Sequence, residues 1–482
     1  MVFSSLTFLF AFLPITLILY YLVPKKAKNV VILISGLVFY AWGEPIYVLV
    51  MILSTFIDYT AGRIIDKYDD RPKIRTACLL VSLIMNIGLL ATFKYLGFII
   101  EALNAGFGIA IPNPNLPLPI GISFFTFQSM SYTIDLYRRQ IKVQKNAASF
   151  MAFVTLFPQI VAGPIVRYED IQNEIDDRTI TEKMIGDGIS RFIVGLGKKV
   201  LIANNIGLLW TEIKAMDYGE ISAVTAWLGI LAFTFQIYFD FSGYSDMAIG
   251  LGKMMGFNFP ENFNYPYISS SIKEFWRRWH ISLSTWFREY LYIPLGGNRK
   301  GTAKTYRNKL IVFFFTGLWH GANWTFIVWG LWHGFFIVAE DLVAKLTGKD
   351  RHSRNSKRRA AGIAKHLYTL LVVLIGFVIF RADTMSQAVA MVAAMFSGVH
   401  ATAQTGLLLA QCMTPLTLCA LAAGVVFSTP VLPAILHRTD ALTQNAQRAV
   451  RVLGGAVLLM LLVTDILHLS AASYVPFIYF QF

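Results

Sequence analysis

Long apolar runs, separated by short charged segments, set the pattern of this chain. Uncharged runs long enough to cross a bilayer as helices appear at 6–23, 221–239, 310–339 and 401–436. Shorter apolar segments lie at 30–43, 45–57, 77–93, 119–134, 147–163, 366–380 and 452–464. The pattern predicts an all-α polytopic membrane protein with about ten to twelve transmembrane helices. It lacks the short alternating segments of a β-barrel.

No stretch has the composition of a separate soluble domain. We expect one integral-membrane domain over 1–482, with N-terminal helices in 1–118, a motif-bearing core in 119–345 and C-terminal helices in 346–482. Within the core, Lys273–Tyr292 mixes Trp with Arg, which favours a helix lying in the membrane interface. The aromatic tail 476–482 is expected to be an interfacial anchor.

The run 310–339 is the most informative part of the pattern. It contains Gly-Leu-Trp-His-Gly twice, at 317–321 and 330–334. As one straight helix it would measure roughly 45 Å, against a hydrocarbon core of about 30 Å. Gly321 and Asn323 offer a place to break it, because Gly is a poor helix residue and Asn a good N-cap. His320 would then end a helix beside a cavity inside the bilayer, which is a functional-site hypothesis by default.

The other candidate groups are weighed against simpler roles. His280 and His333 are further functional candidates, although His333 can also be a ring hydrogen-bonded to a neighbouring helix. The glycines of the two pentapeptides form G-x-x-x-G patterns, which close helix packing explains. Asp240 and Asp246 bracket a polar patch after the span 221–239; each can be a carboxylate at the water interface or one that orients a histidine or a substrate.

Composition and charge agree with a membrane protein. Hydrophobic residues make up 56% of the 482 residues and charged residues 15%, with a net charge of +14. The basic residues lie in short loops, which argues against a nucleic-acid-binding face. Lys25, Lys26 and Lys28 follow the first apolar segment, so the positive-inside tendency predicts an N-terminus outside the cell membrane.

Several familiar kinds of site are missing from the sequence. It has no G-x-S-x-G elbow, no Walker A motif and no H-E-x-x-H motif. Cys78, Cys412 and Cys419 are widely spread and suggest packing thiols rather than a disulfide framework. On a continuous helix His320 and His333 would face roughly opposite sides, so they share a metal only if the helix breaks sharply. We expect no metal and no cofactor.

At the level of longer motifs the chain resembles the membrane-bound O-acyltransferases, most closely the branch that contains the bacterial alginate O-acetylase membrane subunit. The resemblance runs from Met1 to Phe482. It is carried by Gly121-Ile-Ser-Phe124, Ala162-Gly-Pro164, Tyr238-Phe-Asp-Phe-Ser-Gly-Tyr-Ser-Asp-Met247, Glu274-Phe-Trp-Arg-Arg-Trp-His-Ile-Ser-Leu-Ser-Thr-Trp286, Tyr292-Ile-Pro-Leu-Gly-Gly-Asn-Arg299 and Trp319-His-Gly-Ala-Asn-Trp324.

The resemblance implies a ring of membrane helices, some broken or re-entrant, around a central tunnel. It implies that His320 is the catalytic histidine, that His280 is a second histidine of the site, and that His333 is not the catalytic position. The donor would be acetyl-CoA, used as a substrate. The acceptor would be a periplasmic or extracellular protein partner that passes acetyl to a polysaccharide such as alginate. Substrate contacts are expected from Asn323, Trp319, Asp240, Trp276, Arg277 and Arg278.

Three alternatives stay open on the sequence alone. A D-alanyl transferase serving teichoic acids would share the middle motifs, with a carrier protein as donor. A transporter or channel could use His320 as an intramembrane proton relay in a broken helix. The third alternative is a non-catalytic scaffold for polymer export.

Overall fold

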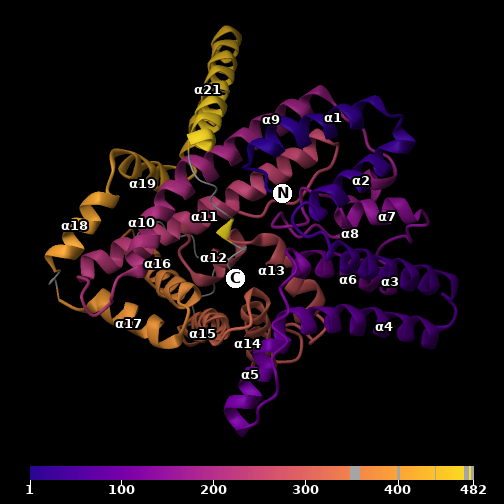
Figure 1. Cartoon of the computed structure of the whole chain (residues 1–482), viewed down its shortest axis with the longest axis horizontal. Helices are drawn as coiled ribbons and strands as arrows, with labels where there is room; N and C mark the ends of the chain where they lie inside the picture. The colour runs from indigo at the N-terminus through magenta and orange to yellow at the C-terminus, as the bar shows by residue number, and fades with distance from the viewer. Residues whose placement is uncertain (348–358, 399–401, 440, 472–476, 479–482) are drawn as a thin grey trace. The chain divides into compact units, whose positions relative to one another are not determined.

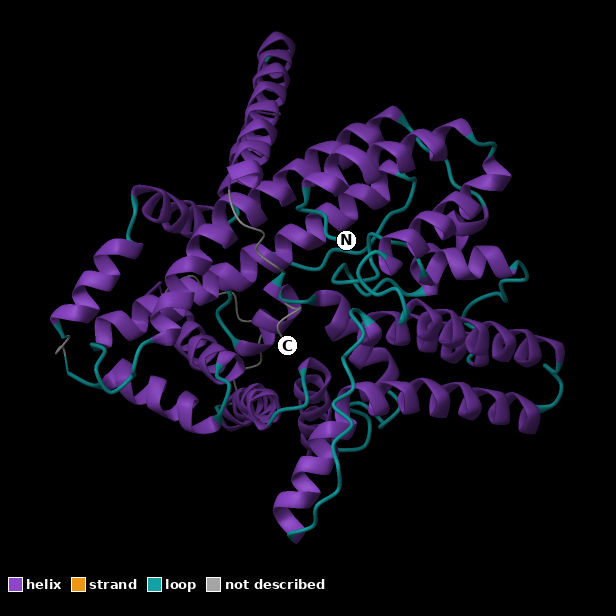
Figure 2. Ribbon diagram, viewed as in Figure 1, coloured by secondary structure: helices purple, strands orange, loops and turns teal. Residues whose placement is uncertain are grey.

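The computed structural model describes residues 1–347, 359–398, 402–439, 441–471 and 477–478. Figure 2 shows helices joined by loops, and no strand occurs among these described residues. The all-α prediction is therefore confirmed. The internal contacts divide the chain into two compact units. Unit 1 comprises Met1–Gly195 and Tyr244–Glu261, and unit 2 comprises Leu196–Gly243 and Asn262–Phe482.

Unit 1 is built largely from the N-terminal helices. Its elements are η1 (Phe8–Phe12), α1 (Leu13–Leu22), η2 (Lys25–Ala27), α2 (Lys28–Ala41), α3 (Val48–Lys67), α4 (Pro72–Leu90), η3 (Ala91–Tyr95), α5 (Leu96–Phe107), α6 (Ile122–Tyr137), α7 (Ala147–Val154), α8 (Tyr168–Asp176), most of α9 (Glu182–Gly197) and the end of α11 (Ala223–Met254). Of these, η1 and η3 are short π-helical stretches and η2 is a 3₁₀ turn.

Unit 2 holds the rest of α11 and the C-terminal helices. Its elements are η4 (Lys198–Ala203), α10 (Asn204–Ala215), η5 (Pro266–Ile268), α12 (Ile272–Arg278), α13 (Ile281–Phe287), η6 (Arg288–Tyr292), α14 (Thr302–His320), α15 (Trp324–Leu346), α16 (Arg359–Arg381), α17 (Met385–Phe396), α18 (Ala403–Cys412), α19 (Pro415–Phe427), α20 (Val431–Thr439) and α21 (Gln444–Ala471).

Seven stretches of the described helices are long and apolar enough to cross a membrane. They are Val48–Lys67, Pro72–Phe107, Glu182–Ala215, Ala223–Met254, Trp324–Leu346, Gly362–Arg381 and Gln444–Ala471. The bent pair Thr405–Cys412 and Pro415–Phe427 raises the count to eight if it is one span. The count lies below the expected ten to twelve because several apolar segments form shorter helices: the segment 147–163, for example, contains the eight-residue α7 followed by turns.

Polar side chains join the membrane helices of unit 1. Helices α3, α4 and α6 lie side by side there (Figure 1). Asp58 of α3 is fully buried and accepts hydrogen bonds from Ser82 and Asn86 of α4 and Thr133 of α6. Because a buried carboxylate needs such donors, this cluster holds the three helices in one register.

The span Glu182–Ala215 was missed by the sequence analysis because it carries charges. In unit 1, Arg191 pairs with Asp246 at 2.8 Å. In unit 2, Lys199 pairs with Asp240 at 2.7 Å, and both side chains are almost fully buried. Pairing makes these charges tolerable inside the protein.

Three local expectations are corrected by the structure. Segment 273–292 is not one interfacial helix: α12 and α13 are separate, and Trp276, Trp279 and Trp286 are buried. Helix α11 continues past residue 239, so Asp240 and Asp246 lie inside a helix rather than after it. Phe477 and Ile478 are buried instead of anchoring at an interface, and the other residues of the predicted anchor lie outside the described residues.

Candidate active site

The break predicted in the run 310–339 is present. Helix α14 ends at His320, Gly321 is extended with φ −174° and ψ 161°, and α15 begins at Trp324. The Asn323 side chain caps α15 by accepting a hydrogen bond from the Thr325 N–H at 3.1 Å. A Cβ on Gly321 would meet a Phe326 ring carbon at 2.3 Å, so a larger residue here would require the Phe326 ring to move.

Helices α14 and α15 pack side by side as a hairpin (Figure 1). Glycines of the two helices face each other across it. A Cβ on Gly317 would meet the Phe326 carbonyl oxygen at 2.2 Å, and one on Gly330 would meet the Phe313 carbonyl oxygen at 2.2 Å. The two G-x-x-x-G patterns therefore let the two backbones touch, as predicted.

Aromatic rings surround His320 at the end of α14. Its ring lies 4.9 Å from Trp319, 4.9 Å from Trp329 and 5.1 Å from Phe380 between centroids, all edge to face. Only 5% of the residue is exposed. His320 therefore lies in an apolar enclosure formed mainly by aromatic rings.

His280 lies between α12 and α13 in a left-handed conformation, with φ 46° and ψ 55°. It is fully buried, and its Nδ1 is 3.1 Å from the Asn262 side-chain oxygen. Its ring packs edge to face on Phe241 at 4.7 Å and on Trp319 at 5.8 Å. Burial lowers the pKa of His280 to about 3, so this histidine is neutral at physiological pH.

Aromatic rings connect the three buried histidines described in unit 2. Trp319 contacts both His280 and His320, and Trp329 contacts both His320 and His333. His333 is fully buried, and neither of its ring nitrogens has a hydrogen-bond partner among the described residues. The neighbour-helix hydrogen bond considered for His333 is therefore not formed.

Trp319 and Trp276 are the two tryptophans among the predicted substrate contacts. Trp319 is 4% exposed and its ring contacts both His280 and His320. Trp276 is 7% exposed and packs on Trp329 at 5.6 Å and on His333 at 5.3 Å. Trp319 thus contacts both proposed catalytic histidines, whereas Trp276 lies one ring further away.

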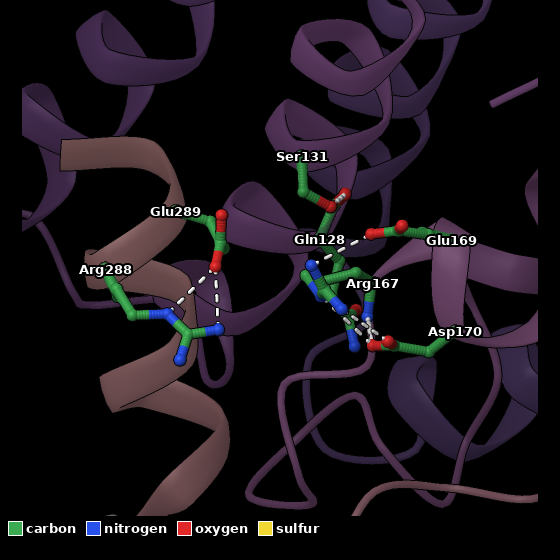
Figure 3. Close-up of polar contacts among 7 residues, drawn as sticks. All are labelled: Gln128, Ser131, Arg167, Glu169, Asp170, Arg288 and Glu289. Carbon is green, nitrogen blue, oxygen red and sulfur yellow. Dashed lines mark hydrogen bonds and ion pairs between the residues drawn. The ribbon is translucent and has the colours of Figure 1, made fainter. Parts of the chain in front are cut away.

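The arginines of segment 273–292, among them the predicted substrate contacts Arg277 and Arg278, differ in their surroundings. Arg277 is exposed, without an ion pair to any described residue. Arg278 pairs with Glu274 at 3.0 Å and donates to the Asn264 carbonyl at 3.1 Å. Arg288 pairs with Glu289 at 2.7 Å, as Figure 3 shows. Arg277 is therefore the arginine of this segment with a guanidinium open to an anion.

Two other predicted contacts already have protein partners. Asp240 pairs with Lys199 and accepts from the Ile478 N–H at 2.8 Å. The Asn323 amide caps α15 with its oxygen and donates to the Asp383 carbonyl at 3.1 Å with its nitrogen. Their contribution to substrate binding stays a prediction.

Two amide side chains of structural interest were missed by the sequence analysis. Asn262 contacts His280. Its position within the Pro- and Asn-rich connection 257–267 was the sequence signal that could have indicated it. Gln128 of unit 1 is fully buried, and neither polar atom of its amide has a hydrogen-bond partner among the described residues. Figure 3 shows Gln128 and, separately, the ion pairs of Arg167 with Glu169 at 3.0 Å and Asp170 at 2.7 Å.

No group of three or more His, Cys, Asp or Glu side chains within the described ranges is placed to hold a metal ion. The sequence-based expectation of a site without a cofactor remains a prediction.

Comparisons with known proteins point to one family. The model of the membrane-bound O-acyltransferase family matches residues 122–382. The probable alginate O-acetylase AlgI of Pseudomonas putida is 42% identical over 100% of both chains. The peptidoglycan O-acetyltransferase of Helicobacter pylori is 35% identical over 80% of this chain and 78% of its own. The teichoic acid D-alanyltransferase of Streptococcus thermophilus is 31% identical over 54% of this chain and 68% of its own.

Proposed function

Since the chain belongs to the membrane-bound O-acyltransferase family and is an O-acetyltransferase of the membrane, we propose that it moves acetyl groups from acetyl-CoA across the cell membrane. The acceptor is a periplasmic or extracellular protein partner, which passes acetyl to an exopolysaccharide such as alginate. The full-length similarity to the Pseudomonas putida protein supports this choice of polymer.

The observation that carries the proposal is the position of His320. It ends α14 at a break in an uncharged stretch, enclosed by Trp319, Trp329 and Phe380. An ionisable group in such a place is costly and is normally kept for function. A neutral imidazole there has the property that acyl transfer needs, because it can take a proton from an incoming hydroxyl.

The proposed reaction is a direct transfer from a thioester to a hydroxyl. His320 takes the proton of the acceptor hydroxyl while the hydroxyl oxygen bonds to the acetyl carbonyl carbon. The carbon–sulfur bond of the thioester breaks, and the proton passes from His320 to the departing thiolate. A positioned base contributes about 10²–10⁴-fold in such a step. The enclosing rings favour a passage that admits acetyl and excludes a sugar polymer.

His280 assists in this proposal by placing the acceptor rather than by removing its proton. The support is that the Trp319 ring contacts both histidines, at 5.8 Å from His280 and 4.9 Å from His320 between centroids. Arg277 would contact the phosphates of acetyl-CoA, because it is the exposed and unpaired arginine of the α12 segment.

The competing functions have weaker support. D-alanyl transfer is disfavoured because the Streptococcus thermophilus D-alanyltransferase aligns with only 54% of this chain. Peptidoglycan remains the second candidate polymer, because the Helicobacter pylori relative aligns with 80% of the chain. A transporter or a scaffold would not explain membership of an acyltransferase family.

The first prediction tests His320. Purified protein is incubated with radiolabelled acetyl-CoA and candidate partners, and transfer by wild type is compared with His320→Ala. We expect His320→Ala to abolish transfer while expression and membrane insertion stay close to normal, because the side chain supplies the base.

The matched control is His333→Gln, in the second copy of the same pentapeptide. It should keep most of the activity, because His333 is not placed as the base. Retention of more than about a tenth of the activity in His320→Ala would exclude the base role, given the usual size of base catalysis.

A further inference from the structure

The backbone at His280 is held in a conformation that few residues adopt. A non-glycine residue with φ 46° is uncommon, and such conformations persist where the surrounding structure imposes them. Two backbone hydrogen bonds impose this one: the Ile281 N–H donates to the Asn262 carbonyl at 2.9 Å, and the Asn264 N–H donates to the Arg278 carbonyl at 2.9 Å. Segment 262–264 is therefore hydrogen-bonded to the chain on both sides of His280, at Arg278 before it and at Ile281 after it.

The orientation of the Asn262 amide follows from Ser282. The Ser282 backbone N–H, which can only donate, points at the Asn262 Oδ1 at 3.3 Å. The Ser282 hydroxyl donates to the same oxygen at 2.9 Å. The atom that faces these donors is thus an acceptor, which identifies it as the amide oxygen and not the nitrogen.

The tautomer of His280 follows from that oxygen. The Asn262 Oδ1 is 3.1 Å from the His280 Nδ1, and two acceptors cannot share a hydrogen bond, so Nδ1 carries the proton. In a neutral ring Nε2 then has a bare lone pair. Nε2 is buried without a hydrogen-bond partner among the described residues, and the rings of Phe241 and Trp319 lie beside the imidazole.

We infer that Asn262 is a positioning residue that holds His280 as its Nδ1-protonated tautomer, so that Nε2 accepts a hydrogen bond from the hydroxyl of the acyl acceptor. This inference rests on the proposed function for the identity of the hydroxyl, but not for the tautomer. It fixes the direction of the hydrogen bond at Nε2. The His280 Nε2 can accept a hydrogen bond from the hydroxyl of the acyl acceptor, and it cannot donate one to the carbonyl oxygen of acetyl-CoA.

A purely structural role for Asn262 can be distinguished from its proposed role in holding the His280 tautomer. Its main-chain carbonyl ties the turn to Ile281, and that bond survives any change of the side chain. Asn262→Leu removes only the amide at nearly the same size. Asn262→Asp keeps an acceptor oxygen facing Nδ1. Asn308→Leu is the matched control, because Asn308 is also fully buried in unit 2 but bonds to the Leu295 and Gly297 carbonyls instead of a histidine.

The direct test is ¹⁵N NMR of full-length protein labelled at histidine and reconstituted in lipid. The two ring nitrogens of a neutral histidine have separate shifts for the protonated and the bare atom, and the His280→Gln spectrum assigns the His280 signals. We expect a protonated Nδ1 and a bare Nε2 in wild type, Asn262→Asp and Asn308→Leu. In Asn262→Leu the signals should shift toward the other tautomer or a mixture. A protonated Nε2 in wild type, or an unchanged spectrum in Asn262→Leu, would overturn the inference.

Kinetics then test the link to the acceptor. Asn262→Leu should lower kcat by about 10–100-fold, by analogy with the loss of a residue that orients a metal-binding histidine. The KM for acetyl-CoA should stay near the wild-type value, and Asn262→Asp should recover at least part of the rate. A rise in the donor KM without a fall in kcat would contradict the acceptor role. If His320→Ala stays active while the tautomer is as expected, the proposed function fails and the tautomer assignment stands.

Discussion

Buried histidines in unit 2 differ in what surrounds their nitrogens. His280 has an amide oxygen at Nδ1, whereas His333 has no hydrogen-bond partner at either nitrogen within the described part of the chain. His320 is enclosed by three rings at the end of a helix. These differences separate an oriented imidazole from one that only packs, and they make individual substitutions informative.

The pKa of His280 makes the stability of the protein depend on pH. Burial lowers this pKa from the usual 6.5 to about 3, so the folded state binds fewer protons than the unfolded state between these values. The contribution of neutral His280 to the free energy of unfolding is complete above about pH 6.5, and it is lost as the pH falls toward 3. At pH 5 the loss relative to pH 7.5 should be about 2 kcal/mol.

The measurement is thermal unfolding in lipid at pH 7.5, 6 and 5 for wild type and His280→Gln. The melting temperature of wild type minus that of His280→Gln should decrease as the pH falls, because only wild type must keep this imidazole neutral. A difference that is constant across this range would show that His280 does not titrate in this way.

The arginines of α12 should separate donor binding from structure. Arg277→Gln should raise the KM for acetyl-CoA several-fold with little change in kcat, because Arg277 is exposed and free to bind phosphate. Arg278→Gln breaks the contacts to Glu274 and Asn264 and should lower stability instead. Donor saturation curves in membranes provide the measurement.

The control for Arg277→Gln is Arg451→Gln on α21. Arg451 is also exposed and is remote in sequence from the α12 segment. The cluster Arg354–Arg359 would serve the same purpose, but it falls almost entirely outside the described residues. An equal rise in the donor KM from Arg451→Gln would indicate bulk electrostatics rather than a phosphate site at Arg277.

At the scale of elements, the α14–α15 hairpin depends on backbone contact between Gly317 and Gly330. A Cβ on Gly330 would lie 2.2 Å from the Phe313 carbonyl oxygen, and backbone cannot move aside as a side chain can. We expect Gly330→Val to destabilise the protein by about 3 kcal/mol, the upper part of the over-packing range, and to abolish acetyl transfer because His320 is displaced.

Gly454→Val on α21 is the matched control, since a Cβ on Gly454 meets nothing within 4 Å. It should leave the melting temperature and the activity close to wild type. The hairpin contact would lose its importance if Gly330→Val melted at the wild-type temperature.

At the scale of the whole molecule, the basic loops predict the orientation in the membrane. The positive-inside tendency predicts that loops 24–29, 63–75 and 345–365 are cytoplasmic. Single cysteines in these loops, in a chain without Cys78, Cys412 and Cys419, should resist an impermeant thiol reagent added to intact cells. Labelling of the 345–365 loop from outside would reverse the orientation. Residues 348–358 lie outside the described residues.

Apolar periodicity and local signals determined much of this protein. They predicted an all-helical membrane chain, the break after His320 and the cap at Asn323, all of which are present. These features depend on residues within a few positions of one another, because helix ends and capping are local. For the same reason, the pentapeptide glycines were enough to indicate close helix packing.

Only the tertiary structure decided where the polar groups go. Glu182–Ala215 was missed as a span because hydropathy counts Arg191 and Lys199 as exposed charges, whereas folding pairs them with Asp246 and Asp240. Asn262 and His280 are 18 residues apart, and nothing local relates them. Long-range pairing compensates a buried charge or amide after the chain has folded, so the pattern along the sequence does not contain it.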